Sequence, residues 1–164
     1  MQRVVGEELE ELRPYFELAA RAATKATCTR AKCGSVIVKD GEIIGRGYNS
    51  PPLDDEGQRM CDMLWDSNKR PKYDLTCCVH AEWRAVLDAC RQNSNKIGGS
   101  RLYFMRIDEN GDFTDAGLPY CTTCSRFTME SGVGEFVLWN NNGADLYDLT
   151  DYNKLSYNFF KRTP

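Results

Sequence analysis

The sequence contains a single histidine and no apolar run that approaches the roughly 18 residues needed to cross a membrane. Its first residues lack the short apolar segment that directs secretion. Positive charge is not in excess, because 21 Lys and Arg stand against 24 Asp and Glu, for a net charge of -3. We therefore expect a cytoplasmic protein that neither enters a membrane nor holds nucleic acid mainly by neutralising phosphates.

Cysteine, in contrast, is abundant, with eight residues in a chain of 164. A chain of this length buries roughly 70% of the surface that its unfolded form exposes, so it can form a stable core without disulfide bonds. In a reducing compartment thiols stay free or bind metal. We expect one globular domain over residues 1–164, with free or metal-bound cysteines rather than a disulfide scaffold.

Hydrophobic spacing predicts four helices. Apolar residues recur every three or four positions from Phe16 to Ala23, which predicts a helix over residues 13–25. Pro14 suits the first turn of that helix, so we do not expect the helix to continue back through Leu12. The other three helices are expected at residues 80–92, 122–131 and 149–160. In the first of these, the residues able to face a core are Ala81, Ala85, Val86 and Leu87.

Four strands are predicted between these helices. Residues 34–39 and 42–48 are β-branched runs joined by Asp40-Gly41, which is the strongest short-range signal for a hairpin. Residues 101–106 and 134–139 are the other two strands. Loops are expected at residues 53–76, with at most one short helix, around Asn110-Gly111, and at residues 140–143. The order α-β-β-α-β-α-β-α favours a three-layer α/β domain.

Two short motifs carry metal-binding residue types. Cys78-Val-His80-Ala-Glu82 and Pro119-Tyr-Cys121-Thr-Thr-Cys124 both stand where helices are expected to begin. Zinc accepts nitrogen and sulfur ligands in tetrahedral geometry, and three protein ligands leave a fourth position for water. His80, Cys121 and Cys124 are the natural three ligands. Zinc lowers the pKa of such a water toward neutrality, and Glu82 is placed to carry its proton. Together, H-x-E and P-C-x-x-C are the pattern of zinc nucleobase deaminases.

The resemblance extends beyond these motifs. Residues 28–41, which begin Cys28-Thr-Arg-Ala-Lys-Cys-Gly, and 45–49, Gly-Arg-Gly-Tyr-Asn49, resemble the first hairpin of the deoxycytidylate deaminase family. Cys61-Asp and residues 72–82 resemble the stretch that leads to the zinc motif of that family. The resemblance implies a cytidine deaminase-like fold, a mixed sheet with helices on both faces. It also implies that Asn49 and the backbone N–H of Ala81 contact a pyrimidine nucleotide, that Glu82 transfers protons, and that the protein forms homo-oligomers, often hexamers.

Three positions depart from the family pattern. Tyr120 intervenes between the proline and the first cysteine of the pair. Trp83-Arg84 replaces a pair whose second residue is commonly Asn, and Ser50 stands where Gly is common. These changes leave the zinc ligands untouched but lie near the expected nucleotide, so they bear on substrate choice. Arg84 could meet a phosphate or be a solvated helix residue, and we favour the second.

The other cysteines and the aromatic residues near the C-terminus are expected mainly to have structural roles. A second, structural zinc on Cys28, Cys61 and Cys78 is a weaker hypothesis that rests on spacing, and burial in the core is expected for Cys33 and Cys90. The acidic residues 54–56 are expected to be a solvated loop face. Five aromatic residues near the C-terminus could close over a base, but we favour core or oligomer packing for them: Tyr147, Tyr152, Tyr157, Phe159 and Phe160.

The combined motifs favour zinc-dependent deamination of a free cytosine nucleotide, with dCMP to dUMP as first choice. One alternative is a deaminase that acts on another nucleoside or base, or on a polynucleotide such as tRNA adenosine or single-stranded DNA cytosine. The acidic net charge and the lack of a Lys/Arg cluster count against a polynucleotide. The other alternative, a non-enzymatic zinc-stabilised interaction module, gives no reason for Glu82.

Overall fold

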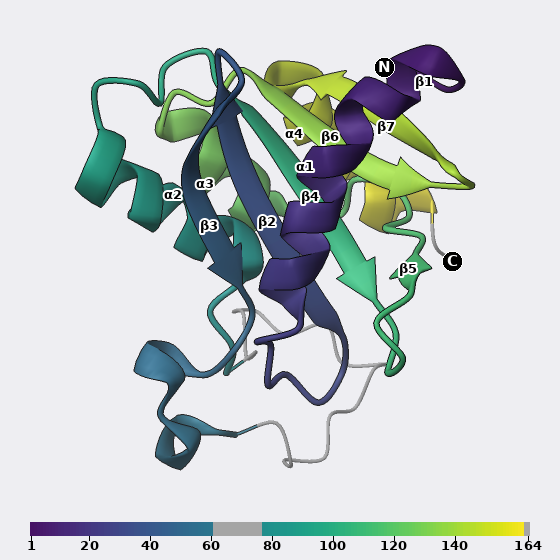
Figure 1. Ribbon diagram of the computed structural model, residues 1–164. Helices are drawn as coiled ribbons and strands as arrows, with labels where there is room; N and C mark the ends of the chain where they lie inside the picture. Colours follow the sequence, from purple (N-terminus) through teal and green to yellow (C-terminus); the bar gives the residue numbers. More distant parts are fainter. Residues whose placement is uncertain (61–76, 163–164) are drawn as a thin grey trace.

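The computed structural model describes residues 1–60 and 77–162, with side chains described up to residue 159 (Figure 1). The strands are β1 (Gln2–Val4), β2 (Lys32–Lys39), β3 (Glu42–Tyr48), β4 (Arg101–Ile107), β5 (Phe113–Thr114), β6 (Glu135–Asn140) and β7 (Gly143–Asp148). The α-helices are α1 (Glu7–Ala23), α2 (Ala81–Asn93), α3 (Thr122–Glu130) and α4 (Leu149–Arg162), and two single 3-10 turns, η1 (Pro52–Asp54) and η2 (Glu56–Gln58), follow β3. No helix in these described ranges is both long and apolar enough to cross a membrane.

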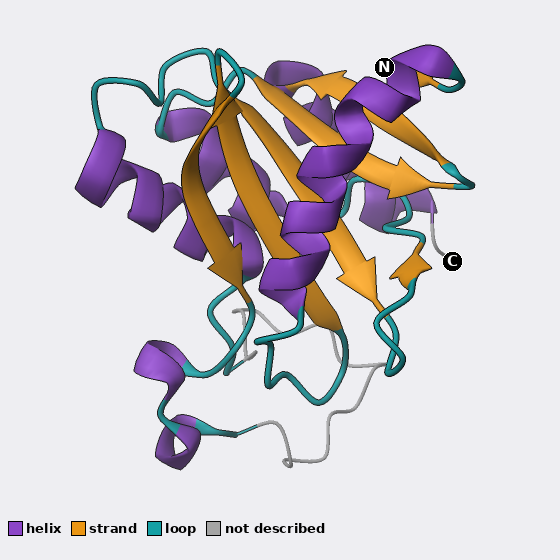
Figure 2. Cartoon of the chain, viewed as in Figure 1, coloured by secondary structure: helices purple, strands orange, loops and turns teal. Residues whose placement is uncertain are grey.

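The strands form one mixed sheet in the order β1-β7-β6-β4-β2-β3, and β5 pairs with β4 outside this order. The pair β4 and β6 is parallel, whereas the other pairs are antiparallel. Figure 2 shows α1 lying across one face of the sheet, with α2, α3 and α4 behind the sheet. The expected three-layer α/β arrangement is therefore confirmed, as is the hairpin of β2 and β3 around Asp40-Gly41.

The layer formed by α1 rests on an apolar stripe. Phe16 is fully buried, and its ring makes edge contacts with Tyr103 of β4 at 5.4 Å and Trp139 of β6 at 5.3 Å between centroids. The helix begins at Glu7, so the prediction that Pro14 stands in its first turn was wrong. Leu9 and Leu12 are buried on the same face, and their burial favours a helix that continues through the proline despite the lost N–H.

The opposite layer places α2 directly on β3. A Cβ on Gly47 would lie 2.1 Å from the carbonyl oxygen of Ala81, and one on Gly45 would lie 2.3 Å from that of Ala85. Only glycine permits the backbones to approach so closely. Ala81, Ala85 and Val86 are buried there as predicted, but Leu87 is 41% exposed, so its predicted place in the core was wrong.

Three strands were missed, and each has a local reason. β7 begins inside the expected loop at residues 140–143, because Asn141 and Asn142 both take positive φ, 46° and 52°, and so close a tight hairpin with β6. β1 and β5 have three and two residues, too few to show a period. The last predicted helix, in contrast, is confirmed as α4, and Tyr152 of α4 stacks on Phe136 at 4.0 Å while Tyr147 packs against it.

The cysteines outside the two motifs divide between core and surface. Cys33 is buried as expected, and burial raises the pKa of its thiol to about 12, so it stays protonated. Cys90 is exposed on α2, so its predicted burial was wrong. Free thiols in the described ranges include Cys28, Cys33, Cys90, Cys121 and Cys124.

Candidate active site

The N-terminus of α2 carries the first motif and is fixed by the chain that follows β3. The amide of Val79 donates to the carbonyl of Ser50 at 2.9 Å, and this isolated bridge joins the two segments. His80 has extended backbone angles at the N-cap position, and α2 begins at Ala81. Consequently Asn49, His80 and Glu82, which are up to 33 residues apart in sequence, lie around one helix start.

The second motif opens α3. Cys121 is the N-cap residue, and its sulfur accepts a hydrogen bond from the amide of Cys124 at 3.2 Å. The side chain of Ser125, in the same turn, donates to Asn153 of α4 at 2.7 Å. The first turn of α3 is thus held by α4, and Cys124 is fully buried.

Together, the two helix starts bring His80, Cys121 and Cys124 into one cluster whose ligand atoms all lie within 4.8 Å of one another. The Nδ1 atom of His80 is 3.0 Å from the sulfur of Cys124 and 3.6 Å from that of Cys121. Nitrogen and sulfur ligands on one tetrahedral zinc are themselves about 3.5 Å apart, from bond lengths of about 2.0 and 2.3 Å. The donor set and its spacing therefore fit zinc. It is the only such cluster among the residues that the structure describes.

The electrostatics of the cluster favour a thiolate. A hydrogen bond from the Cys124 thiol, opposed by burial and assisted by His80, lowers the pKa of Cys121 to about 5. Burial raises the pKa of Cys124, and the negative charges of Glu82 and Cys121 act in the same direction. One of the two sulfurs is thus prepared to bind a cation, and the metal would displace the proton of the other.

Glu82 lies in the first turn of α2 and is only 7% exposed. Burial is the main cause that raises the pKa of its carboxyl group, while the charge of His80 and a contact with the Cys124 thiol lower it. The raised pKa favours the protonated form of this carboxyl group. Glu82 is therefore a buried carboxyl group beside the candidate zinc ligands.

The two expected substrate contacts lie nearby. The Oδ1 atom of Asn49 accepts from the amide of Cys33, and its Nδ2 atom donates to the carbonyl of Ala31, both at 2.8 Å. These bonds fix the side chain and leave it one N–H and one lone pair for another partner. Ala81 is buried at the first position of α2, where a backbone N–H has no partner within the helix.

The family model of the cytidine and deoxycytidylate deaminase zinc-binding region matches residues 9–140. The chain belongs to this family. Among its relatives are deoxycytidylate deaminases of Mycobacterium phage D29, 30% identical over 75% of this chain and 89% of that protein, and of Saccharomyces cerevisiae, 30% identical over 75% of this chain and 35% of that protein. The chain spans about a third of the length of the relatives from S. cerevisiae and Schizosaccharomyces pombe.

Solved structures agree on the cytidine deaminase-like fold. The chain is similar to the dCMP deaminase of cyanophage S-TIM5 in complex with dCMP and dUMP, with a TM-score of 0.56, 24% identity and coverage of 80% of this chain and 82% of that one. It is also similar to the cytidine deaminase of Burkholderia pseudomallei, with a TM-score of 0.56, 20% identity and coverage of 85% and 94%. The predicted fold class is confirmed.

Two residues that depart from the common family pattern, Trp83 and Tyr120, contact other side chains near the site. The ring of Trp83 stacks on His80 at 4.9 Å with an angle of 17° between the planes, so it limits how the candidate ligand can turn. No role for Trp83 was predicted, although its spacing of three residues from His80 places both on one side of a helix start. Tyr120 contacts Phe159 and accepts a hydrogen bond from Arg106 at 3.1 Å.

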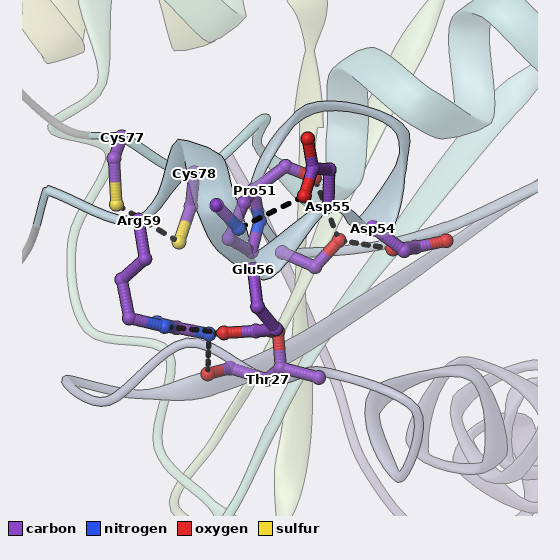
Figure 3. A network of polar contacts seen from close by, with 10 residues as sticks. Thr27, Pro51, Asp54, Asp55, Glu56, Arg59, Cys77 and Cys78 are labelled. Carbon is purple, nitrogen blue, oxygen red and sulfur yellow. Dashed lines mark hydrogen bonds and ion pairs between the residues drawn. The ribbon is translucent and has the colours of Figure 1, made fainter.

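The expectation that Arg84 is a solvated helix residue was wrong, because its side chain is only 18% exposed and forms an ion pair with Asp54. Residues 54–56 are exposed, as expected of a solvated loop face, and they also form polar contacts. Figure 3 shows that Asp54 is joined to neighbouring polar groups and that Glu56 pairs with Arg59, which also reaches Thr27.

The hypothesis of a second zinc stays a prediction. Cys61 lies outside the described residues. Cys28 is partly buried, and the sulfur of Cys78 lies 4.0 Å from that of Cys77.

Proposed function

We propose that this protein catalyses the zinc-dependent hydrolytic deamination of a free cytosine nucleotide, and that dCMP, converted to dUMP, is its substrate. The observation that carries the proposal is the cluster of His80, Cys121 and Cys124 with the buried carboxyl group of Glu82 beside it. The names of the 30% identical relatives support the choice of dCMP.

Zinc, if held by the three ligands, would lower the pKa of a water molecule so that hydroxide can attack C4 of the base. Glu82 would transfer one proton of that water to N3. It would then transfer the second proton, from the hydroxyl group on C4, to the amino group, so that the C4–N bond breaks as the C4=O bond forms and ammonia leaves. The reaction consumes one water and balances as dCMP plus water giving dUMP plus ammonia. His80, Cys121 and Cys124 would hold the metal, and the stacked ring of Trp83 limits how the His80 ring can turn.

Substrate contacts follow from the same helix start. Asn49 has a free N–H and lone pair for the sugar and base, and the backbone N–H of Ala81 faces no helical partner. The family resemblance further supports a cytoplasmic homo-oligomer, with a hexamer as the specific expectation. The net charge of -3 supports a free nucleotide over a polynucleotide.

The test is a panel assay of ammonia release by the zinc-loaded protein. The panel contains cytosine, cytidine, deoxycytidine, their mono- and triphosphates, adenosine compounds, guanine, a tRNA and a single-stranded DNA. We expect the highest kcat/KM with dCMP. A preference for tRNA or single-stranded DNA, together with tight and salt-sensitive binding, would replace the proposed substrate by a polynucleotide.

Glu82→Gln supplies the matched control because it preserves shape and removes the proton carrier. This variant should bind one zinc per chain and release no ammonia from dCMP. Full activity in Glu82→Gln would refute the proposed mechanism. An inactive wild-type protein with a fourth protein ligand on zinc, seen by X-ray absorption, would instead indicate a structural zinc module.

A further inference from the structure

The two departures from the family pattern that flank the site are in direct contact. The Nη2 atom of Arg84 donates to the hydroxyl of Ser50 at 2.7 Å and to the carbonyl of Pro51 at 2.8 Å. Ser50 stands where glycine is common and Arg84 where asparagine is common, and a glycine at residue 50 would offer no side chain to bond. The two side chains are therefore directly bonded to each other.

Asp54 completes this group, which we name the Arg84 clamp: Arg84, Ser50, Asp54 and Tyr48. The carboxylate of Asp54 pairs with the Nη1 atom of Arg84 at 3.1 Å, and it accepts hydrogen bonds from Ser50 and from the hydroxyl of Tyr48, the latter at 2.8 Å. The guanidinium also lies 5.0 Å from the centre of the Tyr48 ring. Arg84 thus contacts four residues at the end of β3 and in the loop that follows it: Tyr48, Ser50, Pro51 and Asp54.

The backbone that the clamp holds needs such support. Leu53 and Asp54 have positive φ angles of 55° and 60°, a conformation that residues other than glycine rarely adopt. Such a turn persists only where surrounding contacts determine it. The bonds to the Asp54 carboxylate supply those contacts, because Leu53 itself is almost fully exposed.

The clamped segment also joins the two halves of the site. Asn49 directly precedes Ser50, and the carbonyl of Ser50 accepts the amide of Val79, which precedes His80. Ser50 is completely buried between them. A shift of Ser50 would therefore move the candidate substrate residue and the candidate metal ligand relative to each other.

We propose that Arg84 is a positioning residue that, through Ser50 and Asp54, sets the place of Asn49 relative to His80 and Glu82. This role rests on the proposed function, because it concerns how nucleotide is held beside the metal. It predicts an effect on substrate affinity rather than on the proton-transfer step. Arg84 does not itself touch the reacting atoms in this arrangement, since its polar contacts are with the loop.

The test compares Arg84→Asn, Ser50→Gly and the double variant, which restores the common family pair. Arg84→Asn should raise the KM for dCMP about tenfold, the loss expected for charged hydrogen bonds of about 1.4 kcal/mol, with kcat changed less than about threefold and zinc content unchanged. Ser50→Gly should have little further effect in the Arg84→Asn background. Arg84→Lys should rescue only in part, because an ammonium cannot make the forked contacts. Arg91→Asn, an exposed arginine on the same helix, should behave as wild type.

Two results would overturn the role of Arg84: an unchanged KM in Arg84→Asn, or losses in the two single variants that simply add. If Arg84→Asn folds poorly, Asp54→Asn tests the clamp from its more exposed side and should raise KM in the same way. Hydrogen exchange separates this outcome from a failure of the proposed function. The Val79 amide should exchange faster in Arg84→Asn whether or not the wild type deaminates dCMP, and unchanged exchange would refute the clamp itself.

Discussion

Gly47 of β3 is the position where a single methyl group should damage the site most. In Gly47→Ala the new Cβ would lie 2.1 Å from the Ala81 carbonyl oxygen, 2.4 Å from the Ala85 nitrogen and 2.8 Å from the Arg84 Cβ. Ordinary contact between such atoms needs about 3.5 Å, so the start of α2 must move by about 1 Å. Two of these three atoms belong to the helix backbone, so a change of side-chain rotamer cannot relieve the clash with them.

The expected loss has two parts. Overpacking of a well-packed interface costs about 1–3 kcal/mol, which lowers the melting temperature of a chain of this size by about 2–12 °C. A displacement of about 1 Å also misplaces His80 and Glu82, and misplacement of that size can cost about 100-fold in rate. We therefore expect kcat/KM for dCMP to fall about 100-fold at a temperature where Gly47→Ala is still folded.

Calorimetry and steady-state ammonia release, measured on the same preparation, check both parts. Gly98→Ala is the matched control, because its Cβ would meet nothing within 4 Å. A Gly47→Ala variant with the melting temperature and kcat/KM of Gly98→Ala would refute the close approach of α2 to β3. A destabilised variant with full activity would refute the link between that approach and the site.

Three further outcomes follow from the structure. Cys124→Ala should lose stoichiometric zinc in metal analysis while Cys90→Ala keeps it, and equal zinc in both would contradict the cluster. A hydrogen bond from Ser50 is the main cause that lowers the pKa of Asp54. The ionised Asp54 carboxylate therefore stabilises the folded protein above the normal pKa range of a carboxyl group, and this stabilisation is lost as the pH falls below about 4. The melting temperatures of wild type and Asp54→Asn should therefore differ at pH 6 and converge toward pH 3, and a constant difference would argue against the ion pair. Phe16→Ala should lose about 3–5 kcal/mol in denaturant unfolding yet retain kcat when folded, whereas a lost kcat would show that the α1 face reaches the site.

The sequence was most informative where short-range chemistry determines structure. The spacing of Cys121 and Cys124 and the H-x-E motif predicted a cluster whose halves are 41 residues apart, because the donor types themselves imply a common metal. The hairpin at Asp40-Gly41 was equally local. These features needed no knowledge of tertiary contacts.

Tertiary contacts account for what was missed. Arg84 reads as a solvated helix residue until the loop after β3 folds over it, and the loop folds there through Asp54, thirty residues earlier. Pro14 reads as a helix start because the burial of Leu9 and Leu12 against the sheet is invisible in a local pattern. Leu87 was predicted to face the core but is exposed. Helical periodicity shows which residues share one face of a helix, but not how much of that face the neighbouring strand covers.

The pairing of β1 with β7 has a consequence for how the chain is made. Gln2 is opposite Leu146 in the register, so β1 has no partner until the 144 residues that separate the two positions have been synthesised. At translation rates of about 5–20 residues per second this delay is about 7–30 s. Once β4 has been synthesised, α1 can pack on β2 and β4, while β7 does not yet exist to pair with β1. β1 therefore joins the sheet only after β2, β4 and β6 have been made, and its pairing with β7 links two segments that lie far apart in the sequence.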